Sequence, residues 1–284
     1  MQEYVEVYMN GLGFYDEYLK LMGNLKDKPD LATPYKIKYL KNIIQNGKVY
    51  KFISFEENAE IKISTLLEGK IWFSFYKTLN DETEFEIDYK LKKVIGKTGY
   101  KKEYIDLIVN YLTEMYDVYS LTYMYQDDMW QYYAANGNGI CVEFEVGDYD
   151  YLYPVEYCDK SKIDFTRMVV SALKQSGMEL SIIPWVVKNP YNQTADMDST
   201  KEKEVRMLYC PYDLAEFNGG TIAYNIKERK GYKGIAKPYE DFKLKIAKVI
   251  IGDKCRVEHV SELQKYFDVH GINYILRGKE YDIR

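Results

Sequence analysis

Two glutamates and an arginine stand at alternate positions in one short stretch of the chain. Glu202, Glu204 and Arg206 lie within residues 201–209, where alternating polar and apolar residues predict a strand. Alternate side chains project from one face of a strand, so these groups would follow one another in steps of about 7 Å. Such carboxylates can stabilise a developing cation or activate a hydroxyl, and the arginine can hold a phosphate or carboxylate. The alternative is a solvated edge with cross-strand salt bridges.

Two further acidic groups could join this stretch in space. Asn80, Asp81 and Glu84 lie in a polar segment that is simply explained as a turn, because such side chains bond to their own backbone. Asp127 and Asp128 precede a short helix and are predicted to cap it. If either group met the two glutamates, their oxygens would suit a Mg²⁺ ion.

Several common chemistries find no support in the sequence. Two histidines, His259 and His270, are predicted as surface residues on or beside the last helix, which removes most histidine-dependent nucleophile and metal designs. The four cysteines form no CxxC pair, which favours reduced structural thiols over a disulfide frame or zinc site. There is no P-loop motif and no strand-linked GxGxxG motif. Carboxylates with a few polar partners remain.

The overall charge and hydropathy limit the partners. A net charge of -5 gives no global basic field, which disfavours non-specific binding to duplex nucleic acid but leaves room for a local basic groove. The 31 tyrosines would suit base stacking, but with the excess of lysine over arginine they are better explained by AT-rich coding. No apolar run reaches the roughly 20 residues of a membrane-spanning helix, and no secretion signal begins the chain. We therefore expect a cytoplasmic protein without a membrane partner.

Residues 120–146 predict the central unit of the core. The pattern indicates the end of a strand, then a short helix with Met129, Trp130 and Tyr133 on one side. A glycine turn follows, and residues 140–146 alternate as a half-buried strand does.

Helices and strands follow one another irregularly in the rest of the chain, which favours an α+β fold over a doubly wound sheet. We expect a mixed, mainly antiparallel central sheet with flanking helices. Residues 1–48 predict a helical N-terminal extension that could dock a partner protein, and residues 49–284 a single α+β domain. The predicted strands cover 49–53, 71–75, 152–157, 201–209, 246–252 and 272–277. The predicted helices cover 57–68, 101–119 and 261–267, the last with a Ser261/Gln264 capping box, and 218–240 a long hairpin or mobile loop.

In this order the chain resembles a large uncharacterised bacterial family, domain of unknown function number 2971. The resemblance covers about residues 49–277, and its most specific part is Met129-Trp130, Tyr133-Ala134 and Gly-Ile-Cys-Val-Glu-Phe at 139–144. The other matching segments are Tyr50-Lys51-Phe52, residues 69–74, Asn80-Asp81 with Glu84-Phe85, Ser120-Leu121-Thr122, Val155 with Tyr157, Glu202-x-Glu204-x-Arg206, and Ile251-Gly252. The chain departs from the family pattern where Glu82, and not proline, follows Asp81. Some members look like parts of antiphage systems, so the resemblance implies a role in bacterial defence or toxin action.

The order of polar residues is also similar to that of mono-ADP-ribosyltransferases, which use an Arg-Ser-Glu trio on NAD. By this analogy Glu204 would orient the NAD ribose and support the oxocarbenium-like transition state, and Glu202 would activate the acceptor. Ser74 would support the nicotinamide pocket, and Lys51 is the nearest stand-in for the first-strand arginine. The other residues expected to bind the cofactor are Tyr50, Asn80, Trp130 and Tyr133.

The similarity implies an NAD-dependent ADP-ribosyltransferase-like effector with a protein or nucleic-acid target. Two alternatives stay open. One is a Mg²⁺-dependent nuclease or phosphoryl-transfer enzyme built on Asp127, Asp128 and the two glutamates. The other is a non-catalytic module whose aromatic pocket around Trp72 and Trp130 recognises a nucleotide or a protein.

Overall fold

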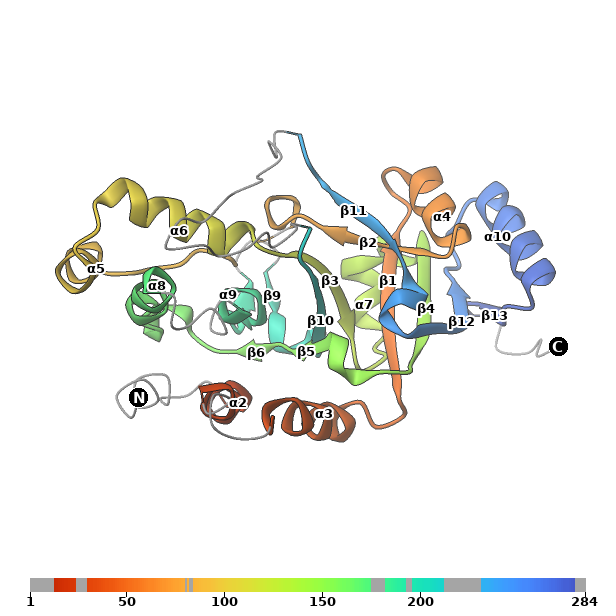
Figure 1. The fold of residues 1–284 in the computed structure, drawn as a ribbon. Helices are drawn as coiled ribbons and strands as arrows, with labels where there is room; N and C mark the ends of the chain where they lie inside the picture. Colours follow the sequence, from red (N-terminus) through yellow and green to blue (C-terminus); the bar gives the residue numbers. More distant parts are fainter. Residues whose placement is uncertain are drawn as a thin grey trace.

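The structure is a computed structural model that describes residues 13–23, 30–79, 81, 84–174, 182–192, 196–211 and 231–278. Within these ranges a central sheet is flanked by helices (Figure 1). Its strands are β1 (Lys48–Ser54), β2 (Lys70–Ser74), β3 (Asp117–Thr122), β4 (Gly139–Val146), β5 (Leu152–Pro154), β10 (Glu204–Tyr209), β11 (Gly234–Pro238), β12 (Leu244–Ile251) and β13 (Tyr274–Leu276). They follow the order β11-β2-β3-β1-β4-β12-β13, with β10 and β5 branching from β3. Within this sheet the pair β12 and β13 is parallel and the other pairs are antiparallel, which confirms the α+β prediction.

Strand β3 is the branch point of this sheet. Along one edge it pairs with β10 from end to end, with Asp117 opposite Tyr209 and Thr122 opposite Glu204. Along the other edge it pairs with β2 at Val118 and with β1 at Thr122. Since a strand has only two edges, β1 and β2 must diverge beside the middle of β3. Among the described strands, none pairs with that stretch of β3 on the diverging side.

Helices contribute to two large cores, one under the sheet and one beside it. The sheet shares its core with α3 (Ala32–Ile43), α4 (Ala59–Leu67) and α10 (Val257–His270). To one side of the sheet, α2 (Phe14–Gly23), α5 (Leu91–Thr98), α6 (Lys102–Glu114), α8 (Thr166–Leu173) and α9 (Ile183–Val186) enclose a second core (Figure 1). Helix α6 illustrates this packing, because its Ile105, Ile108 and Leu112 repeat at helical spacing and are all buried in this second core.

The short helix α7 (Asp128–Tyr133) closes the other face of the sheet. Its Met129 and Trp130 pack with Phe52 and Cys141 in a third, smaller cluster. Strand β4 is therefore covered on both faces, and its burial continues without alternation from Gly139 to Phe144. The half-buried strand predicted here is wrong, because β4 lies inside the sheet between β1 and β12 with helices on both sides.

Three predicted boundaries are also wrong. The helix predicted over 101–119 ends at Glu114, and β3 begins at Asp117. The strand predicted over 201–209 begins at Glu204, because Ser199–Glu202 form a 3-10 turn. Asp198 caps this turn by accepting the backbone N–H of Thr200 at 3.0 Å. The last helix begins at Val257, ahead of the predicted capping box. The predicted hairpin or loop at 218–240 lies partly outside the described residues, which exclude 218–230.

The predicted N-terminal extension contains α2 and α3, and their apolar faces are used inside the molecule. Phe14 and Tyr15 are buried in the core beside the sheet, and the Tyr15 hydroxyl donates to the backbone oxygen of Pro154 at 2.7 Å. Leu40 is buried in the core under the sheet. A partner protein for this segment stays a prediction. In the described part of the chain, no helix combines the length and apolar character that crossing a membrane requires.

Candidate functional site

The start of β10 carries a buried ion-pair network. Arg206 bonds through Nε to Oε1 of Glu204 at 2.7 Å and through Nη2 to Oε1 of Glu84, which lies in the segment after β2. Its Nη1 donates to the backbone oxygen of Trp185 in α9 at 2.8 Å. The guanidinium therefore joins the second core to the sheet, and its planar fork matches two carboxylates at once.

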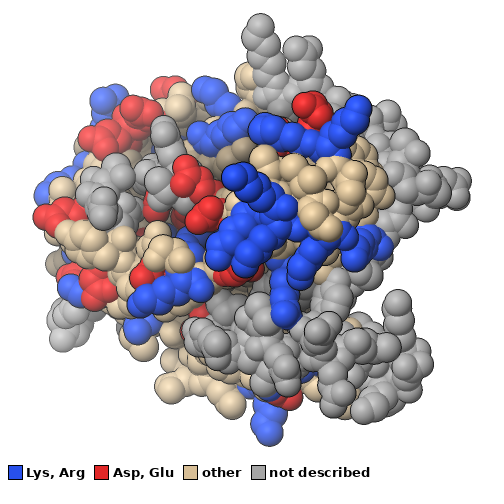
Figure 2. Space-filling model, turned by 90° about the vertical axis from the view of Figure 1, so that its left-hand side faces the viewer, with Lys and Arg blue, Asp and Glu red and all other residues tan. Residues whose placement is uncertain are grey.

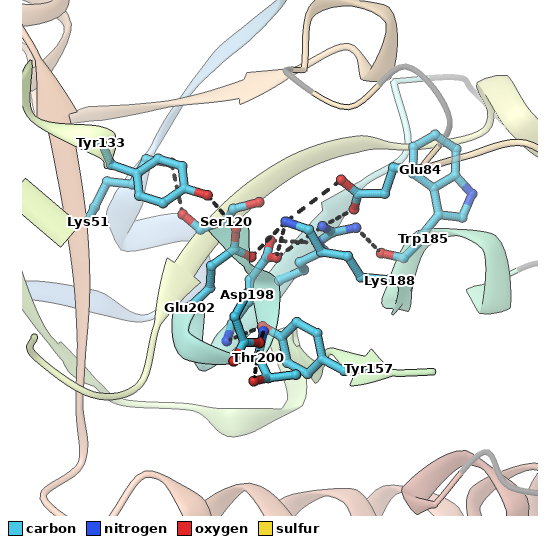
Figure 3. Close-up of polar contacts among 12 residues, drawn as sticks. Lys51, Glu84, Ser120, Tyr133, Tyr157, Trp185, Lys188, Asp198, Thr200 and Glu202 are labelled. Carbon is cyan, nitrogen blue, oxygen red and sulfur yellow. Dashed lines mark hydrogen bonds and ion pairs between the residues drawn. The ribbon is translucent and has the colours of Figure 1, made fainter. Parts of the chain in front are cut away.

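Lys188 connects a third glutamate to this network. It lies in β7 (Val187–Lys188), which pairs in parallel with β6 (Glu156–Tyr157). Its Nζ is 2.6 Å from Oε2 of Glu202, 3.5 Å from Oε2 of Glu204 and 3.9 Å from Oε2 of Glu84. Figure 3 shows the ammonium of Lys188 between Glu84 and Glu202, with the Tyr133 hydroxyl of α7 donating to Glu202 from the other side.

All members of the network are buried. Glu84, Glu202 and Glu204 expose 4–5% of their surface and Arg206 exposes 1%. The solvated strand edge considered from the sequence is therefore wrong. Glu202 and Glu204 do come together, but not as neighbours on one strand face. Lys203 takes a left-handed conformation between them, and Lys188 bridges their side chains.

The two neighbouring glutamates titrate in opposite directions. Burial alone would raise both pKa values. For Glu204 the nearby charges of Arg206 and Lys188, with hydrogen bonds from Arg206 and Ser120, overcome burial and hold the pKa well below its ordinary value. For Glu202, burial and the adjacent Glu204 charge prevail over Lys188 and raise the pKa. Glu204 is thus a fixed anion, whereas Glu202 holds a proton more readily.

A cavity of about 270 Å³ opens beside the network. This volume is close to the lower end of the range of roughly 300–1,000 Å³ for small-molecule sites, so it suits one part of a dinucleotide. Lys188, Arg206 and all three glutamates line it. The facing wall comes from the diverging strands, with Tyr50 and Lys51 of β1 and Ser74 of β2.

Lys51 occupies the place where β1 and β2 separate beside β3. Its Nζ donates to the backbone oxygen of Ser120 at 2.8 Å, and it lies 4.9 Å from the centre of the Tyr119 ring. The ammonium satisfies a strand oxygen that faces the diverging side. Burial lowers the pKa of Lys51 to about 8, although the charge of Glu204 acts in the opposite direction. The cavity therefore holds an amine that titrates close to neutral pH.

Comparisons of the chain with protein-family models, curated proteins and solved structures found no match. The resemblance to family 2971 and the similarity to ADP-ribosyltransferases stay predictions from the sequence.

The structure gathers most of the residues predicted for the site. Those that line the one cavity are Tyr50, Lys51, Ser74, Tyr133, Glu202, Glu204 and Arg206. Trp130 does not line it: the side chain is buried, its Nε1 donates to the Tyr125 hydroxyl at 2.9 Å, and the Arg277 guanidinium lies over the ring. Its predicted place among the cofactor-binding residues of this cavity is wrong, because the indole packs within the third cluster. Trp72 also stands apart, 41% exposed on β2, and Asn80 lies outside the described residues.

The predicted helix caps are not formed. Asp127 stands before α7 without a side-chain cap, and Asp128 is already inside the helix. Asp127 instead lies 3.7 Å from Nη2 of Arg277. Among the described residues, no three acidic, histidine or cysteine side chains are arranged to hold a metal ion. Glu84 does meet Glu202 and Glu204, but around the positive charges of Lys188 and Arg206. Asp127 and Asp128 do not line the cavity.

Two residues of the site were not predicted from the sequence as functional residues. Lys188 lies in a short apolar segment whose spacing gives no sign of a link to Glu202. Tyr157 was recognised only as part of the family pattern, yet its hydroxyl accepts the backbone N–H of Glu204 at 3.1 Å and fixes the start of β10. The signal that could have found Lys188 is a charged residue directly after a buried apolar run, where it must have an acidic partner.

Proposed function

We propose that the cavity binds the nicotinamide riboside part of NAD and that the protein transfers ADP-ribose to an acceptor. One observation carries this proposal: Lys51, Ser74 and Glu204, which come from three distant parts of the chain, line the same cavity. These are the three positions that the similarity to ADP-ribosyltransferases selected. NAD acts here as a substrate that is consumed.

The different environments of the two glutamates support separate roles in this reaction. The bond between ribose C1′ and the nicotinamide nitrogen breaks, and nicotinamide leaves with the electron pair. Glu204, kept ionised, stabilises the positive charge that develops at C1′ and the ring oxygen. An acceptor hydroxyl then attacks C1′, and its proton passes to Glu202, whose raised pKa makes it the better base. Tyr133 and Lys188 hold Glu202 in position.

The network has a small net negative charge, which can stabilise the positive charge that develops on the ribose. Glu84, Glu202 and Glu204 carry three negative charges when ionised, and Lys188 and Arg206 carry two positive charges. The group of five therefore has a net charge of -1 before Lys51 is counted. An acceptor in the cavity would meet preorganised charges that need no rearrangement, which is the main source of electrostatic catalysis.

The test is the release of labelled nicotinamide from NAD by the purified chain. Glu204→Gln should lower the rate by about 10²–10³, the typical effect of losing one preorganised electrostatic group. Glu202→Gln should lower it by about 10²–10⁴, as loss of a general base does. The matched control is Glu262→Gln on the exposed surface of α10, which should keep full activity. Circular dichroism at the assay temperature separates loss of chemistry from loss of fold.

One observation favours a second function, recognition of a nucleotide without turnover. Both carboxylate oxygens of Glu204 and both of Glu202 already have a partner inside the protein. Such a network could serve only to shape the cavity. Saturable NAD binding by the wild type without nicotinamide release would select this function, and absence of both binding and release would refute the use of NAD altogether.

A further inference from the structure

Helix α5 lies at the end of the molecule opposite α10 (Figure 1), and this helix and the start of α6 carry a row of lysines. Residues 89–102 contain six lysines and no acid, although the whole chain has a net charge of -5. Their side chains are exposed on α5 and at the start of α6. We call this surface the lysine ridge, and its members are Lys90, Lys92, Lys93, Lys97, Lys101 and Lys102. Figure 2 views this end and shows basic side chains gathered in the middle of the face, with acidic ones mostly to the left.

The ridge is built on a fixed support. Val94 of α5 is buried in the core beside the sheet, so the opposite side of the helix must face solvent. The backbone N–H of Lys90 donates to Oγ1 of Thr166 at 2.8 Å and ties α5 to the start of α8. Lys93 and Lys97 are four residues apart, so their stems leave the same face of the helix about 6 Å from each other.

Most lysines of the ridge form no ion pair with the described residues. Among the described residues, ion pairs within 4.0 Å involve Lys102, which pairs with Asp106, but not Lys92, Lys97 or Lys101. Lys90 and Lys93 act on Asp164, whose pKa is lowered by hydrogen bonds from Thr166 and further by the charges of these two lysines. None of the six lysines lines the cavity. The surface is therefore a concentration of positive charge that is separate from the cavity.

We infer that the lysine ridge binds the phosphate backbone of a single-stranded nucleic acid. Lysines act as point charges for phosphates. Helix α5 has eight residues and is about 12 Å long, so it spans only a few nucleotides of a strand. Directly beside Lys101, the Tyr100 ring is 39% exposed and rests against Tyr104, with 4.8 Å between ring centres. An exposed, supported ring among lysines is the arrangement on which an unpaired base stacks.

An anionic membrane fits this surface less well. Binding in the plane of a membrane requires an apolar helix face that can enter the lipid. The apolar face of α5 packs against the core through Val94. Ile95 is the most exposed of the large apolar residues of α5, at 39%. The ridge therefore offers charge with one supported aromatic ring, and not a face for insertion. The proposal is independent of NAD chemistry in the cavity.

The test is fluorescence anisotropy with a labelled single-stranded oligonucleotide of mixed sequence at 50–200 mM salt. Lys92→Gln, Lys93→Gln and Lys97→Gln in one variant should flatten the slope of log affinity against log salt by about 2, since each contact with a single strand adds about 0.7. At 0.1 M salt this corresponds to a loss of about 100-fold in affinity. Tyr100→Ala should lower affinity by about fivefold or more.

The matched control neutralises three exposed lysines at the other end of the molecule, Lys245, Lys254 and Lys265. It changes the net charge equally and should leave affinity within about threefold. Equal losses in both triple variants would overturn the ridge as the site. So would binding of the wild type to vesicles rich in anionic lipid but not to the oligonucleotide, and so would no binding to either. Equal melting temperatures of the two variants exclude unfolding as the cause.

Discussion

Replacing Arg206 by methionine should leave two buried carboxylates without their main counter-charge. The side chain is 1% exposed and bonds to both Glu204 and Glu84. Methionine fills much of the space but supplies no charge and no donor. Removing one partner of a buried ion pair typically lowers the free energy of unfolding by about 3–5 kcal/mol. For a chain of this size that corresponds to a fall of about 6–20 °C in melting temperature.

The loss should also depend on pH with a definite sign. In the wild type the depressed pKa of Glu204 contributes stability above the ordinary carboxyl pKa, which is lost as pH falls through the folded value. Without Arg206, burial prevails and the pKa of Glu204 rises above that of the unfolded chain. The variant then gains protons on folding, so its stability increases as pH is lowered from 7. The difference between variant and wild type should therefore shrink toward acid pH.

Urea denaturation followed by tryptophan fluorescence, repeated between pH 5 and 8, measures both effects. The control is Lys70→Met, because Lys70 and Glu68 are also 2.7 Å apart but 39% and 58% exposed. That change should cost less than about 1 kcal/mol. Adding Glu204→Met to Arg206→Met should restore part of the stability, since an apolar pair carries no unpaired charge. If Arg206→Met cost no more than Lys70→Met, the reasoning from burial would be refuted.

Four further substitutions test the site and the sheet. If the charge of the Lys51 ammonium attracts the anionic NAD molecule to the cavity, affinity should fall as pH rises through about 8 and should be pH-independent in Lys51→Met, as calorimetry can show. Tyr133→Phe removes a hydrogen bond that lowers the pKa of Glu202, so the acid limb of the rate–pH profile should move to higher pH. Gly139→Ala should cost at least about 1–3 kcal/mol in urea denaturation because its methyl group would meet a β1 backbone oxygen, whereas Gly96→Ala, with open space, should stabilise α5 by about 0.5–1 kcal/mol.

Local patterns were enough to predict the fold class and most strands. Residues 49–53, 246–252 and 272–277 alternate or run apolar between polar turns, and each corresponds to a strand. The failure at residues 117–119 has a physical cause. Tyr111, Met115 and Tyr119 continue a helical period, but pairing of β3 with β10 outweighs that local preference. Periodicity cannot register a partner strand that lies far along the chain.

The acidic residues of the site could be predicted from the sequence, but the lysine that neutralises them could not. Glu202, Glu204 and Arg206 were selected because they are close in sequence. Lys188 was not, because a strand pair and a turn bring it to Glu202, and its own neighbours are apolar. Trp130 failed for the opposite reason. Its aromatic type fits a cavity wall and a core equally well, and its burial in the third cluster, with the hydrogen bond from its indole to the Tyr125 hydroxyl, shows that it belongs to the core.

The position of Lys51 follows from the branching of the sheet, and this links the fold to the site. If either β1 or β2 continued along β3, a backbone N–H would satisfy the Ser120 oxygen and the cavity would be filled by sheet. Their divergence opens the space and exposes that oxygen, and the Lys51 ammonium occupies the position of the missing donor. A polar group is required there because an unpaired buried carbonyl is costly. The same amine therefore satisfies the exposed oxygen of β3 and places a titrating charge in the cavity. Glu202 and Glu204, which differ in their affinity for a proton, line the same cavity.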